Sequence, residues 1–459
     1  MAGGMGWGIR GQYGHETGAM IPGLLVSLTL VFLLCPRANS LSAARAVAWG
    51  ALAMGFGGSM TYGQTVGLTH DAPLIGNWAA LRWGMLGLAL KGGLWIGFAG
   101  VFLGMGMSGT RYRFRELLLL MLALVGVYYL GIFLLNRPFD PANRVLPVLY
   151  FSDQWHWEPD TVLTPRRECW GGLLTALTAT VAYVGWWRKD RLARNLALWG
   201  VLAGAVGFPA GQSVQAFRMW NPDLFHEGLL ARLTSHFNWW NMMETTFGAV
   251  MGGILGLGAW LNRRRIQPDA DTRADRLSTD AEGTFVVAHV LLLVTAELLP
   301  APAIQALYDP GLTMGILPIA AVAGGRWAPY LVTLPVILAP IAGKTVSALA
   351  YRGDRIGAVG SWLAYLIVPL ALVSVAAFWF AKKSEAGQTG RAFTRGALLL
   401  CTWVYFFLNW AFFDFPWPWA EWTGRTPNGI VFAVCALGLT ALTLTLPRIS
   451  HHPPATTPQ

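Results

Sequence analysis

Long apolar runs separated by short polar segments dominate the chain. A hydrocarbon core about 30 Å thick needs about 20 apolar residues per helix. On that basis the pattern predicts about 13 membrane-spanning helices, at 18–35, 46–67, 84–108, 117–135, 169–187, 196–217, 240–261, 285–299, 311–325, 327–350, 356–381, 396–413 and 430–447. The eighth and ninth are short and flanked by Pro and Gly, as broken or re-entrant helices are. The expected fold class is an all-α, polytopic integral membrane protein.

The composition supports this fold class and argues against a soluble multi-domain protein. Hydrophobic residues make up 54% of the 459 residues and charged residues only 12%, whereas a soluble domain carries about 25% charged residues. The chain is also rich in glycine and tryptophan, with 54 Gly and 23 Trp. Closely spaced small residues are typical of helix packing in membranes, and Trp is enriched at the membrane–water interfaces.

The net charge of +10 raises the question of a nucleic-acid partner. No basic run interleaved with aromatic residues occurs on a soluble stretch, so we expect no nucleic acid. Excess Lys and Arg instead mark cytoplasmic loops, and the basic clusters at 111–115, 188–194 and 263–265 fall in alternate loops. The sequence therefore predicts a multi-pass protein of the cell (inner) membrane, with an extracytoplasmic N-terminus and a cytoplasmic C-terminus.

Short sequence matches indicate an internal duplication. Residues 23–29 resemble residues 172–178, and residues 63–66 resemble residues 211–214, at nearly the same separation. We therefore expect a parallel pair of four-helix units, related by a pseudo-two-fold axis along the membrane normal. The predicted parts are a first repeat at 1–148, a second repeat at 149–299 that includes a charged cytoplasmic linker at 262–284, and C-terminal membrane helices with a short cytoplasmic tail at 300–459.

Ionisable residues inside a membrane cost about 2.5–3.5 kcal/mol each and are therefore candidate functional residues. In the predicted topology nearly all of them lie in the outer half of the membrane, with His289 as the exception. The two repeats each place a polar cluster there. The first cluster is His15, Glu16, Gln64, His70 and Asp71, and the second is Arg167, Glu168, Gln212, His226 and Glu227.

Three interpretations of these polar clusters remain open. In the first, they are solvated loop and helix-end residues, with carboxylates at helix N-termini favoured by the helix dipole. In the second, they line a cavity in which cations meet an anionic solute; the candidate binding residues are Arg10, Gln64, Lys91, Glu168, Gln212, His226 and Glu244. In the third, they catalyse acid–base chemistry or hold a divalent metal ion; the candidate acid–base pairs are His15 with Glu16 and His70 with Asp71.

Other recognisable chemistry is sparse. The four cysteines form no CxxC or Cys/His cluster, and no HExxH-like spacing occurs, so we expect neither a zinc site nor a disulfide framework. No cleavable signal peptide is visible, and the residues identify no cofactor. Aromatic residues alternate with acids at 155–158 and 413–422, a pattern that could stack on sugar rings.

The first function predicted from these features is a membrane transporter, a carrier of a polar, carbohydrate-like or anionic small molecule. Its cavity would open to the extracytoplasmic side, and its partners would be the lipid bilayer and the solute. The alternative is a membrane-embedded enzyme, a transferase or hydrolase acting at the outer leaflet on a lipid-linked or glycan substrate. One-sided polarity favours the enzyme, whereas parallel repeats and Gly-dense helices favour the transporter. A scaffold protein or complex subunit is a third alternative.

Overall fold

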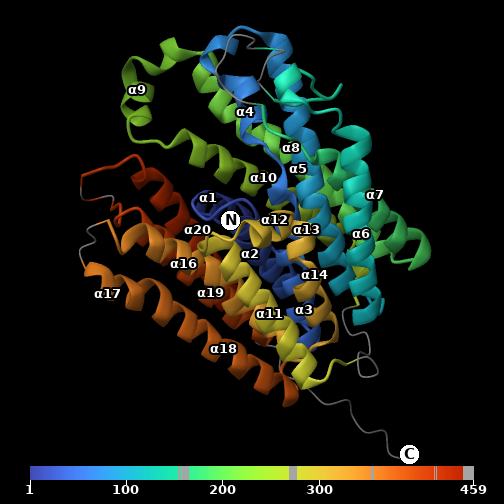
Figure 1. Ribbon diagram of the computed structural model, residues 1–459. Helices are drawn as coiled ribbons and strands as arrows, with labels where there is room; N and C mark the ends of the chain where they lie inside the picture. Colours follow the sequence, from blue (N-terminus) through green and yellow to red (C-terminus); the bar gives the residue numbers. More distant parts are fainter. Residues whose placement is uncertain are drawn as a thin grey trace, which may run out of the picture.

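The computed structural model describes residues 1–152, 157, 165–267, 276–352, 356–417, 419 and 421–447. These residues form helices and loops, with no β-strand among them (Figure 1). The protein therefore has the all-α architecture that the apolar runs predict.

Nine helices in the described part of the chain are long and apolar enough to cross a membrane. They are α2 (Glu16–Leu34), α5 (Trp78–Met107), α6 (Phe114–Leu135), α8 (Arg191–Trp220), α11 (Thr279–Leu298), the α15–η8–α16 helix (Ala328–Leu349), the α17–η9–α18 helix (Gly357–Glu385), α19 (Gly390–Phe412) and α20 (Thr426–Thr445). A tenth span results if α12 (Pro302–Tyr308) is counted with the segment Gly311–Gly324, from which it is bent by 89°. The chain is thus a multi-pass membrane protein.

The count of 13 spans is not confirmed, although each predicted span overlaps helical structure. Predicted span 46–67 overlaps α3 (Ser40–Met54), the 3₁₀ turn η1 (Gly55–Ser59) and α4 (Gly63–His70), so it is interrupted. Predicted span 169–187 is α7 (Trp170–Ala182) continued by the π-helical segment η4 (Tyr183–Trp187), and it is not among the nine. Predicted span 240–261 is α10 (Trp239–Leu261), which is long enough to cross a membrane but is not among the nine. Average hydropathy does not detect a break such as the one within 46–67.

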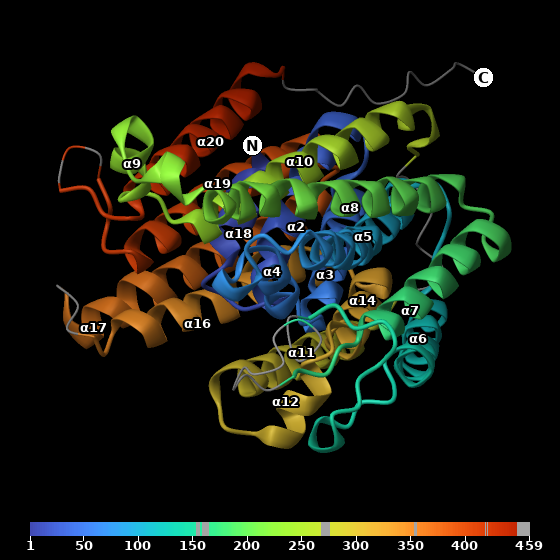
Figure 2. The ribbon, with the colours of Figure 1, turned by 90° about the horizontal axis from the view of Figure 1, so that it is seen from above.

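A short helix, α1 (Ala2–Arg10), lies at the centre of the molecule, and all of its residues are buried (Figure 1). It completes a closed series of neighbours in which α1, α2, α3, α5, α8 and α10 each pack against the next. Helices α16 to α20 lie on one side of this series, and α6 and α7 lie on the other (Figure 2). The remaining short helices are α9 (Gly228–Thr234), α13 (Gly311–Met314) and α14 (Ile316–Gly324).

Glycines bring the backbones of these central helices into contact. A Cβ on Gly204 of α8 would overlap the carbonyl oxygen of Gly92 on α5, and a Cβ on Gly248 of α10 would overlap that of Gly3 on α1. Such approaches let helices associate in a membrane, where there is no hydrophobic driving force between them. These glycines therefore determine the packing of the core.

The predicted two-fold relation between the repeats is not confirmed. Helix α5 of the first unit packs extensively on α8 of the second, but α3 and α10, the pair related to them by a two-fold, have no comparable contact among the described residues. In addition, α3 is interrupted, whereas its sequence counterpart α8 is continuous over 30 residues. The duplication and the boundaries after residues 148 and 299 remain predictions.

The glycine contacts predict a large effect of a single methyl group. Gly204→Ala places a Cβ against backbone that cannot rotate away, so the free energy of unfolding should fall by about 1–3 kcal/mol. Thermal unfolding in detergent measures this loss. The matched control is Gly126→Ala on α6, where a Cβ meets nothing within 4 Å and helix propensity should raise stability by up to about 1 kcal/mol. Equal stability of the two variants would contradict the packing argument.

Candidate functional site

A cavity of about 780 Å³ opens where helices are interrupted. Its walls include the start of α2, the segment that joins η1 to α4, and the bend between α12 and α13. The lining side chains are mainly polar or aromatic. They belong to His15, Glu16, Gly58, Ser59, Met60, Thr61, Tyr62, Gly63, Tyr128, Tyr129, Ile132, Arg137, Arg166, Arg167, Cys169, Trp240, Ala306, Asp309 and Pro310.

The cavity reaches into the part of the molecule that the apolar helices cross. Helix α3 has 15 residues, which at 1.5 Å per residue is about 22 Å of helix, and η1 and the cavity wall follow it. Helix α2 begins at the cavity with Glu16 and runs back for 19 residues. The cavity lining therefore lies away from the start of α3 and close to the opposite end of the bundle, where α4 is found (Figure 1).

Arg10 lies beside the cavity at the C-terminal end of α1 and is buried. It donates hydrogen bonds to the Tyr62 hydroxyl at 2.5 Å and to Glu244 Oε1 at 3.1 Å. Its guanidinium also lies 4.8 Å from the ring centroid of Trp7 and 5.4 Å from that of Trp95. A cation at this position interacts favourably with the helix dipole. The predicted residues Arg10 and Glu244 thus form a buried pair, and Tyr62 connects the pair to the cavity wall.

His15 and Glu16, the first predicted acid–base pair, both line the cavity. His15 Nδ1 lies 3.4 Å from Arg10 Nη1, and the His15 ring meets the Tyr62 ring edge-to-face. Partial burial and the charges of nearby Arg10 and Lys344 lower the pKa of His15 to about 4, so its imidazole is neutral at pH 7.

Lys91 and Glu168 form a second buried pair, with 2.6 Å between Nζ and Oε1. Lys91 also donates to the Thr61 carbonyl oxygen at 2.5 Å and to Thr65 Oγ1 at 2.7 Å. Glu168 Oε2 accepts from the Phe151 backbone N–H and the Trp170 indole. Neither Lys91 nor Glu168 lines the cavity, and their charges are satisfied by each other. These bonds attach the chain before α7 to α5 and to the backbone that forms the cavity wall.

Other predicted residues lie outside the cavity lining. Gln212 on α8 is buried and donates to Thr69 Oγ1 on α4 at 2.7 Å, and Gln64 lies half-buried in the first turn of α4. His70 Nδ1 lies 3.5 Å from Asp71 Oδ1, and its ring lies 6.4 Å from the ring of Trp240 in the cavity wall.

His226 and Glu227 are exposed on the loop before α9. The two predicted clusters therefore do not meet in one site. The cavity receives His15 and Glu16 from the first cluster and Arg167 from the second.

Two further arginines at the cavity were not among the predicted residues. Arg137 and Arg166 line it together with Arg167, and all three are exposed. The three arginines line the same cavity because the chain folds back between the end of α6 and the start of α7. Asn136 Oδ1 accepts a hydrogen bond of 2.8 Å from the Gly171 backbone N–H and so joins these two helix ends. In sequence, the available signal was that Arg137 follows the last apolar residue of α6 and that Arg166 and Arg167 precede α7.

Lys344 of α16 forms an ion pair with Glu297 of α11 next to the start of α2. Lys344 also donates to the Tyr13 carbonyl oxygen at 3.0 Å, and the Thr17 hydroxyl donates to Glu297 Oε1 at 3.1 Å. These bonds hold the linker that carries His15 against the C-terminal half of the protein.

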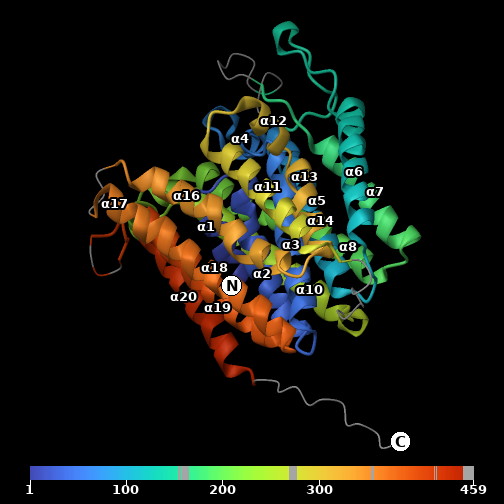
Figure 3. The same ribbon diagram turned by 60° about the horizontal axis from the view of Figure 1, so that its bottom comes forward.

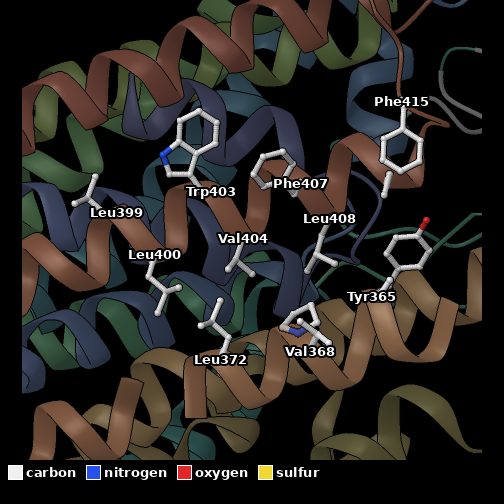
Figure 4. Close-up of a pocket in the computed structure, with 13 residues that line it drawn as sticks. Tyr365, Val368, Leu372, Leu399, Leu400, Trp403, Val404, Phe407, Leu408 and Phe415 are labelled. Carbon is white, nitrogen blue, oxygen red and sulfur yellow. The ribbon is translucent and has the colours of Figure 1, made fainter. Parts of the chain in front are cut away.

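A second hollow of about 550 Å³ is apolar and lies between the η9–α18 segment and α19 (Figure 4). Its only polar side-chain groups are the Tyr365 hydroxyl and the Trp403 indole, which donates to Thr440 Oγ1 at 3.0 Å. A polar solute would find no charged partner there. This hollow is therefore not a candidate site for such a solute.

The remaining candidates lie apart from the cavity lining. Within the described residues, no group of three His, Cys, Asp or Glu side chains is arranged to hold a metal ion. In the predicted aromatic clusters, Trp417 and Trp419 stack on each other with their ring centroids 4.1 Å apart, and Trp417 also packs on Trp410. Trp155, His156 and Glu158 lie outside the described residues.

Comparison of the chain with protein-family models, with curated proteins and with solved structures finds no match in any of the three. The site is therefore interpreted from its own geometry.

The Lys91–Glu168 pair predicts a non-additive pattern of stability. Glu168→Gln leaves a buried ammonium without its counter-charge and should lower the free energy of unfolding by about 3–5 kcal/mol. Lys91→Met should cost a similar amount, and the double variant should lose less than the sum. Thermal unfolding in detergent measures all three. The control is Arg326→Gln, whose ion pair with Glu385 is exposed and should contribute less than about 1 kcal/mol; additive losses would contradict the assignment.

Proposed function

We propose that the protein is a carrier of a small polar anion in the cell (inner) membrane, with its cavity open to the extracytoplasmic side. The observation that carries this proposal is the position of the cavity. It lies where interrupted helices meet and is lined by three arginines.

Helix breaks inside a membrane protein have a specific physical meaning. Backbone N–H and C=O groups that leave a helix must find other partners, so broken helices are tolerated where they line a polar cavity. Transporters commonly build their substrate sites from such discontinuous helices. Here the break after α3 provides Gly58 to Gly63, and the bend after α12 provides Asp309 and Pro310. Two breaks facing one cavity favour a carrier over a scaffold protein.

The charges at the cavity favour an anionic solute. Arg137, Arg166 and Arg167 face two carboxylates, Glu16 and Asp309, and neutral His15 adds no charge at pH 7. Arginine binds carboxylates and phosphates through two parallel hydrogen bonds, and cations at a cavity mouth raise the local concentration of anions. The rings of Tyr62, Tyr128 and Trp240 supply apolar surface for a carbon skeleton, so carbohydrate-like anions are included.

The basic clusters support the proposed orientation. Residues 111, 188 and 263–265 lie near one another, because Arg188 donates to the Arg111 carbonyl oxygen and Asn195 at the start of α8 donates to Asn262 at the end of α10. Arg111 also shares a small pocket with Ser42 near the start of α3. This end of α3 is opposite the cavity. By the positive-inside rule, it would be cytoplasmic and the cavity extracytoplasmic.

The enzymatic alternative retains one supporting observation. His15 and Glu16 share the cavity, and a neutral imidazole beside a carboxylate could transfer protons to or from a bound lipid-linked or glycan substrate. The bent and unwound helices are not required by that chemistry, which is why the carrier is preferred.

The carrier proposal predicts a specific loss of anion uptake. Proteoliposomes containing the protein should accumulate at least one member of a panel of labelled inorganic phosphate, dicarboxylates and sugar phosphates. The double variant Arg166→Gln/Arg167→Gln should bind the accepted anion about 10- to 100-fold more weakly, since a hydrogen bond to a charged group contributes about 1.5–3 kcal/mol. Counterflow measures uptake and a competition assay measures affinity.

Arg232→Gln is the matched control, because Arg232 is an exposed arginine on α9 outside the cavity lining. Its uptake should equal that of the wild type. No uptake of any panel member, combined with turnover of an added outer-leaflet substrate that His15→Ala abolishes, would replace the carrier with the enzyme.

The proposed orientation predicts one-sided labelling. In a background without Cys35, Cys169, Cys401 and Cys435, a membrane-impermeant maleimide should label Arg232→Cys in intact cells. It should label Arg264→Cys only after the membrane is opened, because the arginine triplet at 263–265 would be cytoplasmic. The reverse pattern would invert the orientation and place the cavity on the cytoplasmic side.

A further inference from the structure

One interface runs from the cavity to the opposite end of the bundle, between α3 and the α13–α14 segment (Figures 1 and 3). We call this interface the α3–α14 seam. At the cavity end, a Cβ on Gly311 would lie 2.5 Å from the carbonyl oxygen of Gly55. Farther along, the Trp49 indole donates to the Ile319 carbonyl oxygen at 3.3 Å. The seam is therefore continuous along most of α3.

At the far end of the seam, Arg45 is buried and bonded to backbone. Its guanidinium donates to the carbonyl oxygens of Val322 at 3.1 Å and Gly325 at 2.9 Å. These carbonyls lie at the C-terminal end of α14, where the last turn of a helix has unsatisfied acceptors and a negative partial charge. Arg45 thus closes the seam by capping α14.

A small polar pocket lies directly beside this capping arginine. Its lining includes Ser42, Arg45, Trp49, Ser108, Tyr112 and Ala323, and its volume is about 30 Å³, which is room for about one water molecule. We call it the inner pocket. The seam thus has a large polar cavity at one end and a small polar pocket at the other.

Beyond the Gly311–Gly55 contact at its cavity end, the seam differs from the α5–α8 interface in how it is held. Helices α5 and α8 touch backbone to backbone at Gly92 and Gly204, so neither can slide without overlap. Across the seam, Trp49 and Arg45 donate to main-chain carbonyls, and water can replace such bonds without leaving an acidic partner buried and unpaired. The sharp bend beside Asp309, where α12 joins α13 at 89°, provides a place about which the α13–α14 segment can turn.

We propose that the solute crosses the protein along the α3–α14 seam, and that Arg45 is the positioning residue that keeps its inner end closed in the present conformation. This inference rests on the proposed carrier function. Movement of α13–α14 away from α3 would join the inner pocket to the cavity while the α5–α8–α10 helices remain fixed.

Cross-linking across the seam tests this proposal. In the cysteine-free background, Ser42→Cys and Ala323→Cys place thiols on the two walls of the inner pocket. A short, cleavable bis-thiol reagent should reduce uptake of the anion accepted from the panel at least about tenfold, and cleavage should restore it. The control pair is Asn195→Cys with Asn262→Cys, which joins α8 to α10 at a hydrogen bond of 2.9 Å and should leave uptake unchanged after cross-linking.

A second readout does not depend on uptake. In vesicles that expose the cytoplasmic face, a membrane-impermeant maleimide should label Ser42→Cys several-fold faster in an Arg45→Ala background than with Arg45 present, because the seam loses the arginine that caps α14. Ser42→Cys with Arg45→Lys should label at an intermediate rate. Lysine keeps a hydrogen-bond donor for the end of α14, but it lacks the planar guanidinium that donates to two carbonyl oxygens at once. Labelling of Asn195→Cys should be the same in all three backgrounds.

The outcomes separate the two proposals. Uptake that persists after cross-linking of residues 42 and 323 overturns the seam as the path and leaves the carrier function standing. Absence of uptake by the protein without cross-linker overturns the carrier function and the path with it. Unchanged labelling of Ser42→Cys in the Arg45→Ala background would contradict the proposal that Arg45 keeps the inner end of the seam closed, whether or not uptake is present.

Discussion

The need to satisfy every backbone polar group within the membrane is the constraint on which the rest of the structure depends. Most of the chain meets it with continuous helices. The chain leaves regular helix after α3 and again between α12 and α13, and both interruptions face one polar cavity. The side chains around the cavity compensate for these breaks: Lys91 Nζ donates to the Thr61 carbonyl oxygen in the unwound segment, and Lys344 Nζ donates to that of Tyr13 in the linker before α2.

The buried helix α1 is packed closely against two neighbouring helices. Its glycines lie against α10 and α2, with Gly3 beside Gly248 and Gly6 beside Pro22. Close contact on both faces fixes the end of α1, and Arg10 is held there by Tyr62 and Glu244. Because Tyr62 also lines the cavity, one side chain connects the central packing with the candidate binding surface. A substitution at a glycine of α1 should therefore disturb the cavity from a distance.

Much of the helical architecture could be predicted from the sequence, whereas the site could be predicted only in part. Apolar runs identified helices because membrane spans require a minimum apolar length, but the run at 46–67 concealed a break, since glycine and serine scarcely lower its average hydropathy. The outer clusters included His15 and Glu16, which line the cavity. Arg137 and Arg166 were missed because a fold-back held by Asn136 brings them together. His226 proved to be exposed.

The distribution of ion pairs separates supporting charges from charges available to a ligand. Arg10 and Lys91 are buried, and each has a carboxylate partner within 3.1 Å; a ligand that displaced either carboxylate would have to replace a bond in a region of low dielectric, at high cost. The cavity arginines, by contrast, are exposed, so a ligand anion need only displace water and mobile counter-ions from them. A solute held by Arg166 and Arg167 could thus bind and leave without dismantling the pairs that keep the helices in place, which is the property a carrier requires of its site.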